Sequence, residues 1–170
     1  MKEAAVQTHN LIKTFSGEEV IKACNMTVPR GSIYGLLGIN GAGKTTVFKM
    51  LSGLLMPIGG TAEVLGMDIV SQRRKVLKNI GTIIETPIFY DHLPAKENVE
   101  IHLSYMGIEN VDVKSVLEAV DLQPTNRHPV SKYSLGMRQR LGIARALSHK
   151  PQLLTQLSHQ FLTDNPSEIG

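Results

Sequence analysis

The chain has 170 residues and a formal net charge of +3 at pH 7, with 42% hydrophobic and 19% charged residues. This size and balance fit one globular domain and exclude a second full domain, an intrinsically disordered chain and, with one cysteine, an internal disulfide framework. No apolar run approaches the ~20 residues of a membrane-spanning helix, and the first residues lack the apolar segment of a secretory signal, so we expect a cytoplasmic protein.

The first part of the chain has the pattern of a β layer. The apolar residues Cys24, Met26 and Val28 alternate with polar ones, which is typical of a strand buried on one face. Together with residues 10–15, this strand predicts an antiparallel β layer. The next run, residues 32–37, is apolar nearly throughout, as expected of a strand covered on both faces in a parallel sheet.

A glycine-rich segment follows this predicted buried strand directly. After it, Val47, Met50, Leu51 and Leu54 stand three or four positions apart, which predicts a helix with one buried face. The chain therefore places a strand, a glycine-rich loop and a helix in that order.

Further along, a basic segment at residues 71–79 predicts a helix, and residues 80–84 predict a short core strand. From about Pro94 the pattern becomes helical. The spacing of apolar residues predicts three helices, over residues 99–106, 113–120 and 135–147. The stretch from Pro151 onward has no readable pattern.

This order predicts one domain over residues 1–170, made of an α/β core and an inserted helical subdomain. We assign about 1–86 and 147–170 to the core with its β layer. About 87–146 form the helical subdomain.

The sharpest motif is Gly38-Ile39-Asn40-Gly41-Ala42-Gly43-Lys44-Thr45, which satisfies G-x-x-x-x-G-K-[ST] between a predicted strand and a predicted helix. Glycines let backbone N–H groups turn toward the phosphates, and the start of a helix adds the positive end of its dipole. Lys44 would reach the β- and γ-phosphates, and the Thr45 hydroxyl would bind Mg²⁺. With Thr46, these residues form the predicted phosphate site of a nucleoside triphosphate.

Two blocks of the sequence resemble the ATP-binding subunits of ABC transporters. The first contains the N-G-A-G-K-T-T core that ends at Thr46, and the second is Tyr133-Ser134-Leu135-Gly136-Met137-Arg138-Gln139-Arg140-Leu141. The second block is similar to the family signature L-S-G-G-Q-x-Q-R. Leu135 and Met137 depart from its commonest form, and Y/F-S-L-G-M variants resemble the subfamily that exports bacitracin and lantibiotic peptides or confers immunity to them. The resemblance covers about residues 5–154.

The resemblance implies a second phosphate site at the signature. In the family, the residues that match Ser134, Leu135, Gly136 and Met137 contact the γ-phosphate held by another subunit, so that ATP joins two subunits head to tail. A serine and free N–H groups at a helix start suit this role physically. The alternative is that Ser134 only caps the helix that follows it.

Two more positions follow from the resemblance. Phe15 stands where the family places an aromatic ring against adenine, and its alternative is a core phenylalanine. Glu85 stands at the site of the family's glutamine-containing loop, which senses Mg²⁺ and the membrane subunit. A glutamate could reach the metal through water, and its alternative is an exposed loop residue.

The resemblance stops after Leu154. The family continues with hydrophobic residues and then Asp-Glu-Pro-Thr, whose Asp orients Mg²⁺ and whose Glu activates the attacking water, and this chain has neither at that place. Asp164 and Glu168 do not replace them, because neither follows an uninterrupted buried strand. We identify no catalytic residues and expect a C-terminally truncated domain with feeble hydrolysis, since losing a general base costs ~10²- to 10⁴-fold in rate.

Residues 166–170 again resemble the family, which suggests the hypothesis of a shifted reading frame over about residues 155–165. Sequencing the gene through and beyond these codons tests it. If no other frame encodes Asp-Glu-Pro-Thr, the hypothesis is wrong.

The resemblance implies an incomplete P-loop NTPase core of the ABC type, α/β in class, with an N-terminal antiparallel β layer and a helical subdomain. The implied function is the ATP-binding subunit of an ABC transporter, which binds Mg-ATP and in intact relatives hydrolyses it to drive transport, here of peptide antibiotics. The implied partners are a transmembrane permease and a second ATP-binding subunit, with no nucleic acid. The implied location is the cytoplasmic face of the cell membrane.

Three alternatives stay open at this point. The chain could be a non-hydrolysing ATP-binding module that joins an intact subunit, or a non-functional gene fragment. It could also be an ABC ATPase that acts on ribosomes or DNA, although those usually carry tandem domains or long insertions that 170 residues cannot hold.

Overall fold

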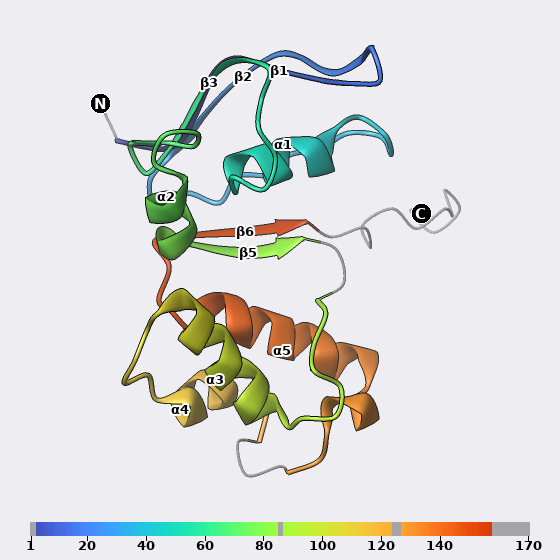
Figure 1. The fold of residues 1–170 in the computed structure, drawn as a ribbon, viewed down its shortest axis with the longest axis vertical. Helices are drawn as coiled ribbons and strands as arrows, with labels where there is room; N and C mark the ends of the chain where they lie inside the picture. The colour runs from blue at the N-terminus through green and yellow to red at the C-terminus, as the bar shows by residue number, and fades with distance from the viewer. Residues whose placement is uncertain (1–2, 85–86, 124–126, 158–170) are drawn as a thin grey trace, which may run out of the picture.

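The computed structural model describes residues 3–84, 87–123 and 127–157, and every structural statement below concerns these residues. Figure 1 shows two bodies. A body of strands with two short helices lies above a helical body, and a pair of parallel strands lies where they meet. The predicted α/β class with an antiparallel β layer and a helical part is confirmed.

The β layer is a four-stranded antiparallel sheet with strand order β2-β1-β3-β4. Strands β1 (Ala4–Phe15) and β2 (Glu18–Pro29) form a long hairpin that projects from the body (Figure 1). Strand β3 (Gly59–Val64) pairs with β1, and the short β4 (Met67–Asp68) pairs with β3. The layer is longer than the sequence pattern indicated.

Two helices pack beneath this layer and share its hydrophobic core. They are α1 (Lys44–Leu51) and α2 (Arg73–Asn79). Three of the four residues predicted on the apolar face of α1 are buried, namely Val47, Met50 and Leu51. Leu54 lies beyond the end of the helix and is exposed.

The parallel sheet has two strands in the described residues. Strand β5 (Ile80–Ile84) confirms the predicted core strand, and it pairs along its whole length with β6 (Leu153–Leu157). A Cβ at Gly81 would collide with the carbonyl oxygen of Ala146, so β5 packs closely against the helix that contains Ala146.

The predicted strand at residues 32–37 is wrong. This segment has no regular secondary structure, and the side chains of Ile33 and Leu37 are 104% and 92% exposed. A strand covered on both faces needs neighbours along the sheet, and the described residues supply none for this segment. The segment is apolar enough for a buried strand, but among the described residues it has no neighbouring strand to pair with.

The helical body contains α3 (Ala95–Met106), α4 (Val113–Glu118), a 3₁₀ turn η1 (Val130–Lys132) and α5 (Leu135–Leu147). The three α-helices bury a second hydrophobic core. The prediction for α5 is confirmed residue for residue.

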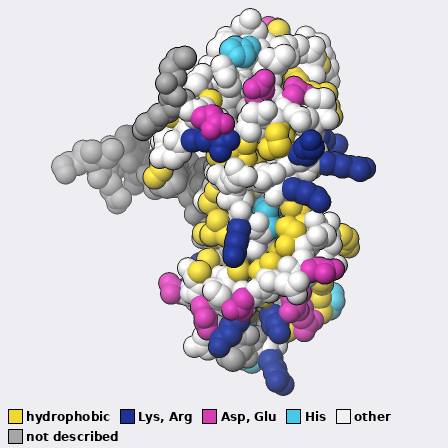
Figure 2. All heavy atoms as spheres, turned by 90° about the vertical axis from the view of Figure 1, so that its left-hand side faces the viewer, with side chains coloured by type: hydrophobic (Ala, Val, Ile, Leu, Met, Phe, Trp, Pro, Cys, Tyr) yellow, Lys and Arg dark blue, Asp and Glu magenta, His cyan; other side chains and the backbone are white. Residues whose placement is uncertain are grey.

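None of the helices in the described ranges is both long and apolar enough to cross a membrane. Figure 2 shows one face of the molecule, on which apolar side chains gather where the two bodies meet. Lys, Arg, Asp and Glu side chains lie around them.

Candidate nucleotide-binding site

The predicted phosphate loop connects the exposed segment 32–37 to α1. Gly41 and Gly43 both have left-handed backbone conformations, with φ of 83° and 80°, which glycine adopts without strain. At Gly43 space is also tight, because a Cβ there would collide with the side chain of Ile21 on β2. The two glycines therefore let the chain turn sharply and enter the helix against the β layer.

The Lys44 ammonium lies inside the curve of this loop. Its Nζ donates hydrogen bonds to the carbonyl oxygens of Gly38 at 2.6 Å and Ile39 at 2.7 Å. These acceptors are neutral, and an ammonium bonds more strongly to an ionised phosphate oxygen. A polyphosphate that entered the loop could therefore replace the two carbonyl oxygens as the hydrogen-bond acceptor of Lys44.

Helix α1 begins at this loop with a free, positive end. Its first turn contains no acidic residue, and no side chain caps it, so its first N–H groups and its dipole favour an anion. Thr45 and Thr46 are half-buried in the same turn. The loop, Lys44 and the helix start thus bring an ammonium and a positive helix end together, and their binding of phosphate stays a prediction.

Among the predicted metal ligands, Thr45 lies in this first turn, whereas Glu85 lies outside the described residues. Within the described ranges, no group of three or more His, Cys, Asp or Glu residues could hold a metal ion. A hydroxyl next to a phosphate site fits Mg²⁺, because this ion usually takes few protein ligands and completes its shell with phosphate and water.

Phe15 ends β1 at the tip of the hairpin, and its side chain is 44% exposed. The alternative of a core phenylalanine is therefore wrong. The Lys13 ammonium lies 5.4 Å from the centre of the ring, so one side of the ring has a cation as its neighbour. Figure 1 shows the hairpin tip and the phosphate loop on the same side of the molecule. The adenine contact stays a prediction.

The signature residues form the start of α5 in the other body. The Ser134 hydroxyl accepts a hydrogen bond from the Met137 N–H at 3.3 Å, as a helix cap. Leu135 is 60% exposed, and an added Cβ at Gly136 would meet nothing within 4 Å. The helix is therefore capped as the alternative predicts, and its start is also open to a molecule approaching from outside.

Two side chains whose contacts the sequence did not indicate, Arg138 of α5 and Asn98 of α3, hold the segment that precedes α3. Arg138 donates to the Asp91 carboxylate at 2.8 Å. The buried Asn98 side chain accepts from the Tyr90 N–H at 2.8 Å and donates to the Pro94 carbonyl at 3.0 Å. A polar residue at a buried position of a helix was the available signal for Asn98.

The structure does not bring a catalytic carboxylate to the end of β6. The described end of this strand carries Thr155, Gln156 and Leu157. Asp164 and Glu168 lie outside the described residues, as do most of residues 155–165. The phosphate loop and the signature are both formed, but they lie in different bodies of the molecule.

Comparison with known proteins gives consistent matches. Residues 21–156 match the sequence profile of the family described as "ABC transporter". The chain is 49% identical over 150 residues to the uncharacterised ABC transporter ATP-binding protein YcbN of Bacillus subtilis (strain 168), covering 88% of this chain and 49% of that protein. It is 44% identical over 150 residues to the bacitracin transport ATP-binding protein BcrA of Bacillus licheniformis, covering 88% and 49%.

A further relative is the lantibiotic transport ATP-binding protein SrtF of Streptococcus pyogenes, 36% identical over 149 residues, with 88% of this chain and 64% of that protein covered. The chain spans about half the length of the first two curated relatives.

Solved structures show the same fold. An ATP-binding subunit of an ABC transporter superposes with a TM-score of 0.78 at 24% identity, covering 88% of this chain and 64% of that one. The ATP-binding cassette MJ0796, as a dimer in a post-hydrolysis state bound to ADP and Pi, gives a TM-score of 0.76 at 24% identity, covering 88% and 72%.

Proposed function

Because the chain belongs to the ABC transporter ATP-binding family, we propose that it binds Mg-ATP at the loop formed by residues 38–46. The observation that carries this proposal is the pair of hydrogen bonds from Lys44 to loop carbonyls directly before a helix start that has no acidic residue. Such a loop has positive charge and unpaired donors in one place, and its natural ligand is a polyphosphate.

Each residue of the site has a role in this proposal. The ammonium of Lys44 leaves the Gly38 and Ile39 carbonyls and binds the terminal phosphates, while the first N–H groups of α1 bind the phosphate nearest the helix. The Thr45 hydroxyl is the protein ligand of Mg²⁺, which when bound neutralises phosphate charge. The exposed ring of Phe15 stacks on adenine, supported by its place at the hairpin tip.

We infer that residues 134–137 bind ATP held by a second ATP-binding subunit. Two observations support this inference: the start of α5 has no acidic residue in its first turn, and the space above Gly136 is empty. One structural neighbour, MJ0796, is described as a dimer bound to ADP and Pi. We assign about residues 87–146 to the helical subdomain that carries this second site.

The proposed biological role is that of a transporter subunit at the cytoplasmic face of the cell membrane, bound to a permease. Relatives named as bacitracin and lantibiotic transport proteins support peptide antibiotics as the substrate class. The helical body also exposes apolar side chains that suit a protein contact, with Ile88 and Tyr105 exposed by 87% and 81%.

For the residues described here we propose binding rather than hydrolysis as the chemical contribution. Hydrolysis needs a base that activates water, and the described end of β6 carries no carboxylate. We therefore propose that ATP hydrolysis belongs to the whole proteins of this kind, which are about twice as long as this chain.

Titration calorimetry with Mg-ATP on the 170-residue chain tests the proposal. We expect one site, with affinity reduced at least 10-fold in Lys44→Ala, because the variant loses the one side-chain cation placed inside the loop. Lys22→Ala is the matched control, since Lys22 is an exposed lysine of β2 in the same body. A chain that has its native circular dichroism and does not bind Mg-ATP would refute the proposal.

A further inference from the structure

One asparagine of the phosphate loop stands directly before a glycine. Asn40 is followed by Gly41, whereas every other asparagine of the chain is followed by a residue that has a side chain. Glycine lacks the Cβ that shields a backbone nitrogen from the side chain before it. The Gly41 nitrogen is therefore the least shielded of the backbone nitrogens that follow an asparagine.

The structure leaves both members of this pair free to react. Asn40 is exposed, and a Cβ added at Gly41 would meet nothing within 4 Å. Among the described residues, neither the Asn40 side chain nor the Gly41 N–H takes part in a hydrogen bond. The Asn40 side chain can therefore turn toward the Gly41 nitrogen without losing a hydrogen bond of its own.

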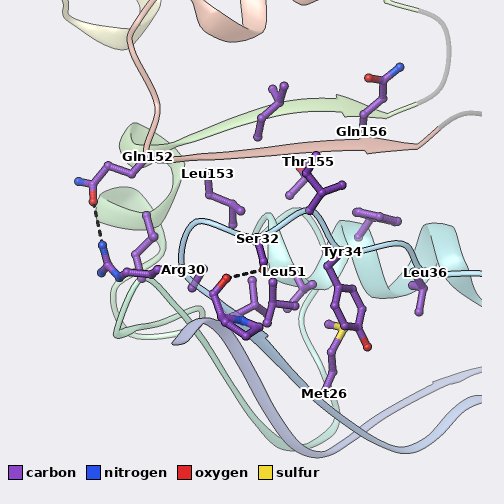
Figure 3. Close-up of a pocket in the computed structure, with 18 of the residues that line it drawn as sticks. Met26, Arg30, Ser32, Tyr34, Leu36, Leu51, Gln152, Leu153, Thr155 and Gln156 are labelled. Carbon is purple, nitrogen blue, oxygen red and sulfur yellow. Dashed lines mark hydrogen bonds between the residues drawn. The ribbon is translucent and has the colours of Figure 1, made fainter. Parts of the chain in front are cut away.

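The segment that leads into the loop has few packed neighbours. Figure 3 shows Ser32, Tyr34 and Leu36 along the edge of a cavity of about 680 Å³. No strand among the described residues pairs with this segment. A change of backbone conformation at Asn40 therefore displaces few contacts.

A positive charge lies next to the pair. The Nζ of Lys44 donates to the carbonyl oxygens of Gly38 and Ile39, the two residues before Asn40. Attack on a side-chain amide starts from a backbone nitrogen that has lost its proton and passes through an anionic intermediate, and a nearby cation stabilises both. The loop therefore combines an unshielded nitrogen, an exposed amide and a neighbouring ammonium.

We propose that Asn40 is a deamidation site, and that its conversion to aspartate or isoaspartate destroys the phosphate loop of the nucleotide-free chain. The deprotonated Gly41 nitrogen attacks the Asn40 Cγ and forms a C–N bond. The bond from Cγ to Nδ2 breaks, and Nδ2 takes a proton from the solvent and leaves as ammonia. Water then opens the five-membered imide ring at one of its two carbonyl carbons. One water is consumed and one ammonia released, with no oxidant, reductant or cofactor.

The product has a carboxylate at a place where the loop needs positive charge. A carboxylate at residue 40 would attract the Lys44 ammonium and repel a polyphosphate. Isoaspartate would also lengthen the backbone by one carbon directly before Gly41, whose φ of 83° shapes the loop. This loss of binding rests on the proposed function, whereas the conversion of Asn40 does not.

Bound nucleotide should protect the site. In the proposed complex with Mg-ATP, the Gly41 N–H donates to a phosphate oxygen, as the backbone groups of such loops do. A nitrogen that keeps its proton in this bond does not attack the side chain. Deamidation is therefore expected to accumulate in chains that stand without nucleotide.

Ageing of the 170-residue chain at pH 8 and 37 °C without nucleotide tests the conversion. Trypsin releases residues 31–44 as one peptide, whose single asparagine is Asn40, and deamidation raises the mass of this peptide by about 1 Da. Asn110 is the internal control, because it is also exposed in a loop but precedes Val111. We expect Asn40 to convert at least 10-fold faster than Asn110, and Mg-ATP to slow Asn40 alone at least 10-fold.

Calorimetry measures the consequence for binding. The number of Mg-ATP sites in the aged wild type should fall in proportion to the converted fraction of Asn40. Asn40→Gln should keep its starting number of sites, because a glutamine amide must close a six-membered ring, which forms more slowly. Asn40→Asp should bind Mg-ATP at least 10-fold more weakly than the fresh wild type.

Four results would overturn the proposal. They are conversion of Asn40 no faster than that of Asn110, a converted chain that keeps all its Mg-ATP sites, equal loss of sites in Asn40→Gln, and wild-type affinity in Asn40→Asp. A fresh chain that binds no Mg-ATP would instead refute the proposed function, and the mass of the 31–44 peptide would still decide whether Asn40 converts.

Discussion

Protonation of His102 should destabilise the protein below neutral pH. His102 lies on α3, and His149 follows α5. The centres of their two rings are 5.8 Å apart. The Nε2 of His102 is buried and has no hydrogen-bond partner among the described residues. Burial, and then the charges of Arg145 and His149, lower the pKa of His102 from 6.5 to about 4.

The pKa of His102 differs between the unfolded and the folded chain, and this difference sets how stability depends on pH. The unfolded chain takes up a proton near pH 6.5 and the folded chain only near pH 4, so the stabilising contribution is complete above pH 6.5 and is lost as the pH falls toward 4. Between pH 7.5 and 5.0 the full difference corresponds to about 2 kcal/mol, and partial exposure of the ring reduces this to about 1 kcal/mol.

Urea unfolding of the wild type and of His102→Leu at pH 7.5 and pH 5.0 measures this contribution. We expect the wild type to lose about 1 kcal/mol more stability than His102→Leu on acidification. His9→Leu, which changes an exposed histidine of β1, should behave as the wild type does. Equal pH dependence in the wild type and His102→Leu would refute the reasoning.

Three glycines give further predictions. Gly136→Ala adds a Cβ in open space on a helix. In thermal unfolding it should stabilise the chain by up to about 1 kcal/mol, and it should weaken ATP-dependent dimer formation. A destabilised variant would contradict the open space above Gly136. At Gly43, alanine would need a φ of 80° and would collide with Ile21. We therefore expect Gly43→Ala to lower the free energy of unfolding by about 1–3 kcal/mol and to lose Mg-ATP binding in calorimetry. Unchanged binding would contradict the proposed role of the loop geometry. In Gly81→Ala the added Cβ would collide with the Ala146 carbonyl. We expect the free energy of unfolding in urea to fall by about 1–3 kcal/mol, with no direct effect on the phosphate loop. An unchanged stability would mean that β5 and α5 can separate.

The helix α5 could be predicted to the residue because its limits are local. Ser134 caps it, and apolar residues repeat along one face up to Leu147. The same holds for the phosphate loop, since a run of glycines before a lysine determines its shape through backbone geometry near the motif. Local chemistry therefore explains the shape of the loop and of the helix start, and phosphate binding at both stays a prediction.

Strand β5 was predicted correctly, but segment 32–37 and strand β6 were not, because a strand depends on partners far away in the sequence. The apolar pattern of residues 32–37 predicts a strand, but no described segment pairs with it. Strand β6 was missed because its side chains are half-buried or exposed up to Leu157. The pair of His102 and His149 was also missed, since nothing in the sequence brings residues 47 positions apart together.

The two hydrophobic cores described above differ in where their residues lie along the chain. The buried residues of the first run from Val6 to Ile80, and those of the second from Ala95 to Ala144. Each is a continuous stretch, so each can close on the ribosome as soon as its own segment has emerged. The β5–β6 ladder joins Ile80 to Leu153 and has a large loop-closure cost. During synthesis β5 therefore has no strand partner among the described residues until almost all of the described chain has been made.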